Sequence, residues 1–497
     1  MTPNDPPAGA ATLIERRTIE VVPESERHGT PFNQFTLWFG ANMQITAVVN
    51  GALATVFGAD PLWGITGLLV GNLLGGIVMA LHSAQGPRLG LPQMISSRAQ
   101  FGVFGAVLPL VLVIVMYLGF AATGTVLAGQ AVDEIVHTDM QGVGIAVFGV
   151  LTAAVAVLGY RHIHALGRAA TVLGGIGFTY LAVRLVTTTP HLSSLLGAKP
   201  FDGATFLLAI SLGAGWQLTY GPYVADYSRY LPRLTSPRTT FHCTLWGSVI
   251  GSQWSMAFGA LVAAVPAASG AGFLDNQVGF LGRLGGGGTV AMLVYLVVVV
   301  GKLTVNTLNA YGGFMSIVTT VSAFTRERHV SPRARSLYII GFIAASVLIA
   351  DVASSNFLSD FKNFVLTLLM VFTPWSAINL IDYYLVSREK VDIPALYRPA
   401  DRYGRWNAVA LGCYTVGVVA QIPFLDQTLY TGPITKALGG ADVSWIVGLV
   451  VTAGLYLPLG RSRSRAPEQM IYPEGFLEPS TPGAPAEVGH AGSTSRP

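Results

Sequence analysis

The stretch GKLTVNTLNAYGG, residues 301–313, lies inside an apolar run that reads TVAMLVYLVVVV before it and FMSIVTTVSAF after it. As a helix, such a run is long enough to cross the roughly 30 Å hydrocarbon core of a bilayer. At about 100° per residue, Lys302, Asn306 and Asn309 fall on one face of that helix. A lysine facing lipid at the bilayer centre costs at least about 2.5 kcal/mol. We therefore expect this polar face to point into a bundle of membrane helices.

The composition of the whole chain favours a membrane-embedded bundle. Of its 497 residues, 52% are hydrophobic and 11% are charged, which is roughly half the charged fraction of an ordinary soluble domain. Apolar stretches of about 20 residues recur along the chain, each sufficient for one crossing. They predict about twelve spans, near residues 33–57, 61–82, 103–130, 141–160, 169–187, 203–228, 244–266, 288–320, 336–353, 357–385, 406–425 and 441–460. We predict an all-α polytopic membrane protein whose transporter domain covers residues 33–460.

The positions of Lys and Arg predict the orientation, because cytoplasmic loops retain positive charge. With the N-terminus inside, nearly all basic residues fall in cytoplasmic segments. The exceptions are four residues of outer loops and two within spans, namely Lys199, Arg283, Lys362 and Lys436, and Arg184 and Lys302. We therefore expect a multi-pass protein of the cell inner membrane with both termini in the cytoplasm. The net charge of +4 marks the inner membrane face rather than a nucleic-acid partner.

The two ends of the chain differ from the apolar middle. Residues 1–32 are polar and contain no short apolar core, so we expect a cytoplasmic N-terminal segment without a cleavable signal peptide. Residues 466–497 are rich in Pro, Gly, Ser and Glu, and we expect them to form a disordered cytoplasmic tail.

Two of the spans contain helix-breaking sequence. In hydrocarbon, non-helical backbone is tolerated only where it is buried in protein or lines a cavity. The first span contains WFGANMQITAVVNGAL (38–53), with small and amide residues in its middle, and the sixth contains SLGAGWQLTYGPYVADYSRYLP (211–232), with a Gly-Pro pair. Because the two lie five spans apart, we predict two inverted five-helix repeats plus two C-terminal helices. The alternative is that small residues only permit close helix packing.

Polar and aromatic residues near these breaks predict a substrate site. An asparagine amide offers one acceptor and two donors, enough to read the edge of a heterocycle, and aromatic rings offer stacking surfaces. The candidates for the polar edge are Asn309, Gln217 and Gln44, and those for stacking are Phe120, Trp216 and Tyr220. The alternative interpretation is that the asparagines only join helices and the rings only pack.

Lys302 is the candidate ion-coupling residue. In a dry site the charge of a lysine can change during a transport cycle. The alternative is a permanent pairing of Lys302 with one neighbour. Asp226 and Asp382 lie at the cytoplasmic ends of spans six and ten, where we expect ion pairs with loop arginines such as Arg229 or Arg388; a role in gating is the alternative.

Four motifs resemble those of the purine/cytosine permeases, the first nucleobase:cation symporter family, in its bacterial form. They are GPRLGLPQMISSRAQFG (86–102), YGPYVADYSRYLP (220–232), NAYGG (309–313) and INLIDYYLVSREKVDIPALY (378–397), and the resemblance extends from about Glu15 to Leu459. It implies two inverted five-helix repeats with substrate held between spans one, three, six, eight and ten. It also implies a secondary transporter that imports cytosine, a purine or a related heterocycle by alternating access, driven by H+ or Na+.

The resemblance also implies roles for individual positions. Phe120 and Gly124 fall where family members often place a tryptophan and an amide residue, Tyr220 falls at the sixth-span aromatic, and Asn309 falls at the eighth-span asparagine. Gly124 lacks the amide that often reads the base, so the identity of the substrate stays open.

The resemblance places the coupling ion between the first and eighth spans. Sodium-using relatives combine first-span carbonyls, here such as that of Ala41, with two adjacent eighth-span hydroxyls. The matching positions are Leu303 and Thr304, so one hydroxyl is missing. Lys302 lies beside them, and its ammonium could take the place of sodium. This favours H+ over Na+ as the coupling ion.

Two other classes of function remain as alternatives. One is an amino-acid or other small-molecule carrier of the same fold, and the other is a membrane-embedded enzyme. The spans contain no metal-ligand cluster, no nucleophile–base set and no phosphate-binding glycine loop, so we expect a transporter without a cofactor. Which heterocycle is carried, and in what oligomeric state, does not follow from the sequence.

Overall fold

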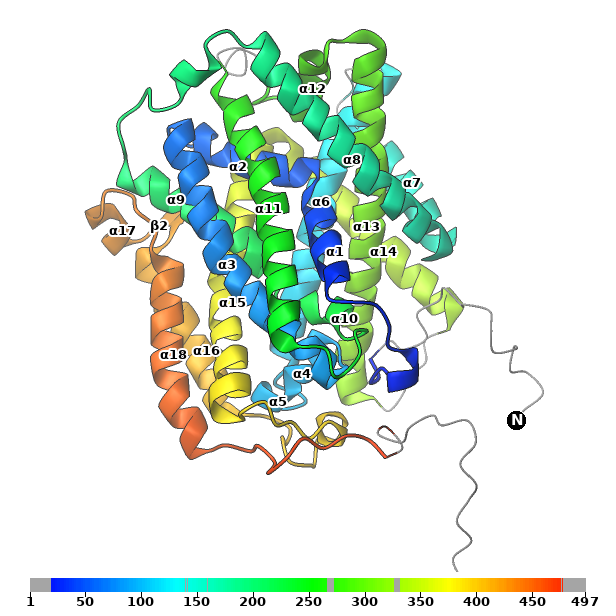
Figure 1. Ribbon diagram of the computed structural model, residues 1–497, viewed down its shortest axis with the longest axis vertical. Helices are drawn as coiled ribbons and strands as arrows, with labels where there is room; N and C mark the ends of the chain where they lie inside the picture. Colours follow the sequence, from blue (N-terminus) through cyan, green and yellow to red (C-terminus); the bar gives the residue numbers. More distant parts are fainter. Residues whose placement is uncertain are drawn as a thin grey trace, which may run out of the picture.

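The structure is a computed structural model that describes residues 19–138, 140, 142–158, 160–265, 272–325, 331–474 and 476. The predicted N-terminal segment before residue 19, residues 326–330 of the basic loop, and the tail beyond residue 476 lie outside the described residues. Figure 1 shows a bundle of long helices that run along the long axis of the molecule. The prediction of an all-α protein is confirmed, since the described strands are two short segments.

The helices and strands follow one another along the chain. The α-helices are α1 (Phe32–Asn42), α2 (Ile45–Val56), α3 (Pro61–Leu89), α4 (Gln93–Ser96), α5 (Arg98–Phe101), α6 (Val107–Val136), α7 (Val143–Leu158), α8 (Tyr160–Thr188), α9 (Gly203–Leu218), α10 (Val224–Ser228), α11 (Pro237–Ala264), α12 (Gln277–Gly285), α13 (Gly288–Phe324), α14 (Pro332–Ala353), α15 (Phe357–Leu380), α16 (Ala408–Val419), α17 (Pro433–Ala437) and α18 (Ser444–Ser462). A π-helical turn, η5 (Ile381–Val386), continues α15, and 3-10 turns occur at η1 (Glu24–Glu26), η2 (Leu192–Leu195), η4 (Ser354–Asn356), η6 (Pro394–Tyr397) and η7 (Ile422–Phe424). The strands β1 (Asp426–Gln427) and β2 (Tyr430–Thr431) form an antiparallel pair.

Several helices are long and apolar enough to cross a membrane. Among the described residues, five helical stretches qualify by length and composition: Pro61–Leu89, Val107–Val136, Gly288–Phe324, Arg333–Val386 and Ser444–Ser462. Shorter apolar helices occur at Ile45–Val56, Val143–Val157, Val172–Thr188, Gly203–Leu218 and Ala408–Phe424. Each of these stretches falls on one or more of the predicted spans.

Some helices extend beyond the spans predicted from hydropathy. The second span, expected at 61–82, continues as α3 to Leu89, and the seventh, expected from 244, begins as α11 at Pro237. The start of α11 is fixed by Ser236, whose side chain accepts a hydrogen bond from the Thr239 N–H, followed by a proline at the first helical position. The added turns contain polar and charged residues, which an apolar window does not include.

The first and sixth segments are both broken, as predicted. The first is divided into α1 and α2 at Met43 and Gln44, and Gln44 has extended backbone angles (φ −147°, ψ 156°). The sixth is divided into α9 and α10, with the Gly221-Pro222 pair between them. Each break leaves backbone groups without helical partners, so each must lie where protein or a bound species supplies them.

The contacts between helices follow the symmetry of two repeats. The broken first segment packs against the seventh helix (α1 and α2 on α11), and the broken sixth packs against the second (α9 and α10 on α3). The third and eighth helices pair with each other (α6 with α13), as do the fourth and ninth (α7 with α14). Exchanging segments one to five for segments six to ten therefore preserves these contacts, which is what two equivalent five-helix repeats require.

Glycines permit the closest of these contacts. A Cβ at Gly259 of α11 would overlap the carbonyl oxygen of Val48 in α2, and a Cβ at Gly71 of α3 would overlap that of Ile210 in α9. The broken helices therefore lie directly against the backbones of their partners.

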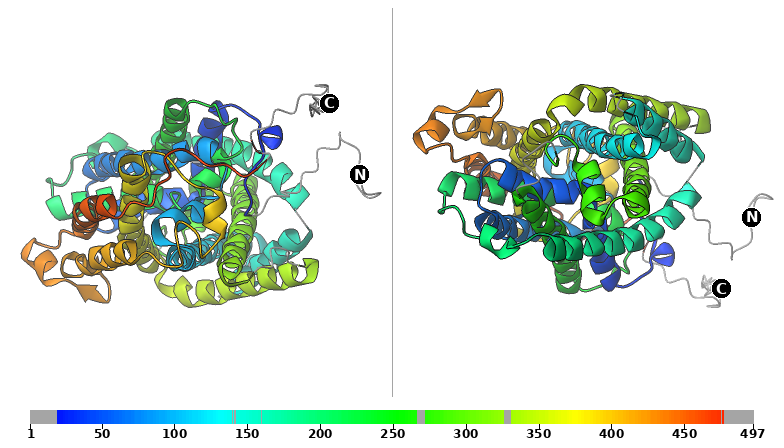
Figure 2. Two further views of the ribbon diagram at one scale, coloured as in Figure 1. Left: turned by 90° about the horizontal axis from the view of Figure 1, so that it is seen from below. Right: turned by 90° about the horizontal axis from the view of Figure 1, so that it is seen from above.

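The last helices lie outside the two repeats. α16 and α18 pack against each other and against α15, and Figure 2 shows this orange and red part of the chain at one side of the bundle in both end views. Beyond α18, Ile471 forms a parallel bridge with Asp392, and the Tyr472 hydroxyl donates to the Arg88 carbonyl (3.1 Å). These contacts lie within residues 466–497, which were expected to be disordered.

Candidate functional site

Lys302 of α13 reaches the break in the first segment. Its side chain is 2% exposed, and Nζ donates to Gln44 Oε1 (2.8 Å) and contacts Thr46 Oγ1. Among the described residues, no carboxylate forms an ion pair with Lys302. The Lys302 side chain is therefore held by neutral oxygens at the break between α1 and α2.

Ala41 and Thr304, the other two residues expected at the ion site, do not hydrogen-bond to the Lys302 side chain directly and have other hydrogen-bond partners. The Ala41 carbonyl accepts a hydrogen bond from Gln44 Nε2 (2.8 Å), so Ala41 is joined to Lys302 through Gln44. The Thr304 hydroxyl donates to the Val300 carbonyl of its own helix (3.0 Å). Gln44, which we expected to read substrate, thus contacts the cation with its amide oxygen.

The three predicted aromatic residues lie together between α6 and α9. The ring centroids of Phe120 and Trp216 are 5.8 Å apart at an interplanar angle of 89°, and those of Trp216 and Tyr220 are 6.0 Å apart at 88°. Phe364 of α15 lies 5.2 Å from Phe120, and Trp38 of α1 lies 5.1 Å from Tyr220. Edge-to-face packing is a preferred geometry of aromatic pairs, and here it brings the three predicted stacking residues together.

Asn42 connects the two broken segments and was not among the predicted site residues. Its Oδ1 accepts hydrogen bonds from Trp216 Nε1 (2.6 Å) and from the Tyr220 hydroxyl (3.1 Å). Its Nδ2 donates to the Trp38 carbonyl (2.7 Å) and to Ser248 Oγ of α11 (3.1 Å). Asn42 therefore fixes Trp216 of α9 and Tyr220, in the break that follows α9, relative to the break in the first segment. Its place in the interrupted stretch 38–53 is the sequence signal that could have identified it.

Gln217 points away from the aromatic cluster and is fully bonded. Its Nε2 donates to Asn72 Oδ1 of α3 (3.2 Å) and to Ser252 Oγ of α11 (2.7 Å), and its Oε1 accepts from Ser248 Oγ (2.6 Å). With both amide atoms engaged, Gln217 joins α9 to α3 and α11 and has no free group for substrate in this structure. We leave it out of the proposed substrate set.

The asparagines of α13 carry polar atoms without partners. Among the described residues, Asn309 Nδ2 and Asn306 Oδ1 are both buried and without a hydrogen-bond partner. A Cβ at Gly124 would overlap Asn306 Oδ1. Gly124 stands on α6 where an amide residue was expected, and the amide oxygen of Asn306 from α13 packs against it.

A second buried polar cluster surrounds Asp382 of the π-helical turn η5. Its carboxylate accepts hydrogen bonds from Gln100 Nε2 (3.1 Å), Ser387 Oγ (3.1 Å) and the Tyr456 hydroxyl (3.0 Å). In the described part of the chain these partners are all neutral, and the expected ion pair with Arg388 is not formed. Asp382 is buried within the π-helical turn η5, and Arg388 lies beyond the end of that turn.

The site contains no arrangement for metal binding within the described residues, where no group of three or more His, Cys, Asp or Glu side chains could hold an ion. What it offers is a set of ring faces, unpartnered amide atoms and one buried ammonium group, placed where two helices are interrupted. Such a set can bind a planar polar molecule and exchange a proton.

Solved transporters share this architecture. The inward-facing conformation of Mhp1 matches with a TM-score of 0.74, at 18% identity, over 94% of this chain and 99% of that one. Mhp1 in a closed conformation with bromovinylhydantoin bound, described as a nucleobase-cation-symport-1 family transporter, matches with a TM-score of 0.69, at 20% identity, over 92% and 98%. At these identities the likeness concerns the fold.

Sequence comparison extends the likeness to family membership. The putative purine-cytosine permease YxlA of Bacillus subtilis is 38% identical over 455 residues, which cover 90% of this chain and 96% of that protein. The model of a family described as permeases for cytosine/purines, uracil, thiamine and allantoin matches residues 21–448. The chain therefore belongs to the cytosine/purine permease family.

Proposed function

We propose that this permease imports a nucleobase-like heterocycle, such as cytosine or a purine, in symport with protons. The observation that carries the proposal is the unpartnered Asn309 amide nitrogen on the same bundle interior as the Phe120, Trp216 and Tyr220 rings. Stacking holds a planar ring without selecting its polar atoms, and a buried amide selects them. The combination fits a flat, polar, uncharged substrate better than an amino acid, whose charged groups would need ionic partners.

Proton coupling is supported by the surroundings of Lys302. A buried cation held only by the oxygens of Gln44 and Thr46 has no counter-charge to offset its desolvation. Its hydrogen bonds join α13 to the break between α1 and α2, and they are strongest while the ammonium carries its proton. Release of that proton weakens the connection between the two segments, which couples protonation to the conformation of the first segment.

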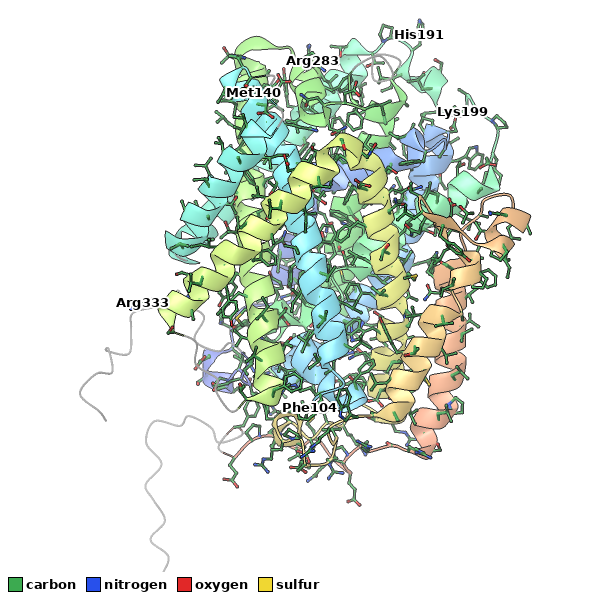
Figure 3. All side chains as sticks on the ribbon, turned by 180° about the vertical axis from the view of Figure 1, so that it is seen from behind. Phe104, Met140, His191, Lys199, Arg283 and Arg333 are labelled. Atoms are coloured by element: carbon green, nitrogen blue, oxygen red, sulfur yellow. The ribbon has the colours of Figure 1, made fainter. Side chains whose placement is uncertain are left out.

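We propose that the protein lies in the cell inner membrane with both termini in the cytoplasm. The dark blue segment that precedes α1 and the end of α18 both lie in the lower part of the bundle in Figure 1. Figure 3 shows Lys199 and Arg283, two of the few basic residues assigned to outer loops, at the opposite end from Phe104. Reporter fusions after Arg333 and after Lys199 test this; an external signal from the Arg333 fusion contradicts it.

The function is tested by uptake into a cell that lacks its own base transporters. Labelled cytosine, adenine, hypoxanthine, uracil, allantoin, hydantoin and amino acids are supplied one at a time, with nucleosides as competitors. We expect saturable uptake of at least one base or related heterocycle, abolished by a protonophore and unchanged when sodium is replaced by choline. Uptake of an amino acid alone would contradict the substrate class, and a strict sodium requirement would contradict the coupling ion.

A further inference from the structure

Two unpartnered polar atoms of opposite kind lie on one face of α13. Asn306 and Asn309 are three residues apart, so their side chains are neighbours on the helix surface. Within the described chain, the atom without a partner is an acceptor in Asn306 (Oδ1) and a donor in Asn309 (Nδ2). A buried polar atom left unbonded costs about 1–3 kcal/mol, so a ligand with one donor and one acceptor would relieve both costs on this face of α13.

Asn306 is held so that its free oxygen stays in place. Its side chain is 2% exposed, and Nδ2 donates to the Ala121 carbonyl (2.9 Å) and to Thr125 Oγ1 (3.0 Å), both on α6. These two bonds fix which side of the amide is the nitrogen. The oxygen is left beside Gly124, which has no side chain to occupy the space.

The free oxygen lies on the aromatic side of α6. Phe120 and Gly124 are four residues apart, so they share a face of α6, and Phe120 packs edge-to-face against Trp216. α6 and α13 pack against each other along their lengths. A planar group stacked on Phe120 would therefore have its edge next to Gly124 and to the two α13 amides.

We propose that Asn306 Oδ1 accepts a hydrogen bond from the substrate while Asn309 Nδ2 donates one to it, so that Asn306 determines specificity. The substrate class that this selects is a heterocycle with a donor and an acceptor on one edge, such as the N–H and C=O of a lactam or the amino group and ring nitrogen of an aminopyrimidine. This inference rests on the proposed function and adds which edge of the substrate the permease recognises.

The test compares each base with an analogue whose edge donor is methylated. The pairs are uracil with 3-methyluracil, hypoxanthine with 1-methylhypoxanthine, adenine with N6,N6-dimethyladenine and cytosine with N4,N4-dimethylcytosine. Affinities are measured on the purified full-length protein for every base that the wild type binds. We expect the wild type to favour the parent base by about tenfold or more, the effect of one lost hydrogen bond in a dry site.

The variants distinguish recognition from packing. Asn306→Ala should lower affinity for the parent base by about tenfold and reduce the preference over the methylated analogue to within about threefold, because the acceptor that reads the donor is gone. Gly124→Ala, which keeps Asn306 but fills the space of its oxygen, should reduce the preference in the same way. Thr307→Val is the matched control, since the Thr307 hydroxyl donates only to the Leu303 carbonyl of its own helix (2.7 Å).

The ratio of the two affinities separates the outcomes. If Asn306 has only a structural role, the substitutions should weaken binding of the parent base and of its methylated analogue equally and leave the preference unchanged. That result in both Asn306→Ala and Gly124→Ala overturns the inference, while the proposed function stands. Failure of the wild type to bind any of the four bases overturns the inference, and if allantoin and hydantoin also fail to bind, the proposed function falls with it. If Asn306→Ala does not fold, the preference measured in Gly124→Ala alone supports or overturns the inference.

Discussion

The polar face of α13 and the cluster around Asp382 are both buried among apolar helices, and they differ in how completely their polar atoms are bonded. Each oxygen of the Asp382 carboxylate has at least one donor, and the chain of bonds continues through Gln100 and Asn379 to Gln85. On α13, two amide atoms have no partner in the described chain, and a cation is held by neutral oxygens. A satisfied network stabilises one arrangement of helices; an unsatisfied one is retained where a bound species completes it.

The largest expected effect is on coupling. Lys302→Gln keeps much of the length and a hydrogen-bonding amide but cannot titrate, so it should abolish concentrative uptake while exchange of internal for external substrate continues. The measurement is substrate accumulation driven by an imposed inward proton gradient, compared with counterflow in proteoliposomes. Arg184→Gln is the control, because it removes the other basic residue predicted within a span. A Lys302→Gln protein that still concentrates substrate would make the lysine structural and direct attention to Thr304.

The next largest effect is a loss of stability when the bonded Asp382 cluster, rather than the polar face of α13, is changed. Asp382→Leu leaves the donors of Gln100, Ser387 and Tyr456 without their acceptor, and should lower the free energy of unfolding by about 3 kcal/mol or more. The loss should be the same with and without substrate, as measured by thermal unfolding in detergent. A variant as stable as the wild type would show that water or other groups replace the carboxylate.

Removing the unpartnered Asn309 amide should have the opposite effect to Asp382→Leu: it should lower substrate affinity and leave stability nearly unchanged. Asn309→Ala should lower substrate affinity by about tenfold to a hundredfold, the effect of one buried hydrogen bond, while thermal stability without substrate stays within about 1 kcal/mol. Binding and unfolding are measured on the same preparation. Wild-type affinity in this variant would remove Asn309 from the site.

The smallest expected effect concerns stacking. Phe120→Ala should weaken binding by about tenfold through loss of ring contact, and Phe120→Trp should be tolerated or shift preference towards larger ring systems. Tyr220→Phe, which loses only the bond to Asn42, should cost about threefold. Binding of a pyrimidine and a purine to each variant provides the comparison. If Phe120→Ala and Tyr220→Ala both bind as the wild type does, Trp216 becomes the stacking residue to test.

Sequence reasoning was most successful where one segment decides the outcome. The broken first and sixth segments were predicted from their glycines, proline and amides, and the comparisons confirm the permease family and exclude the enzyme alternative. It was least successful for side chains whose partners come from elsewhere. Gln217 was a candidate for binding the polar edge of the substrate, and in the structure its three hydrogen bonds go to α3 and α11. Asp382 was expected to pair with a loop arginine such as Arg388 and is bonded by neutral groups instead.

The sequence by itself determined that this chain is a polytopic helical membrane protein with a polar face on its eighth span. The physical reason is that hydrocarbon admits few polar groups, so span length and every buried charge are visible in one dimension. Only the tertiary structure decided which amide atoms are bonded and which are free. Asn306 and Gln217 have the same functional group, and the difference between them lies in what the neighbouring helices present: a glycine beside the oxygen of Asn306, and serine and asparagine side chains around Gln217.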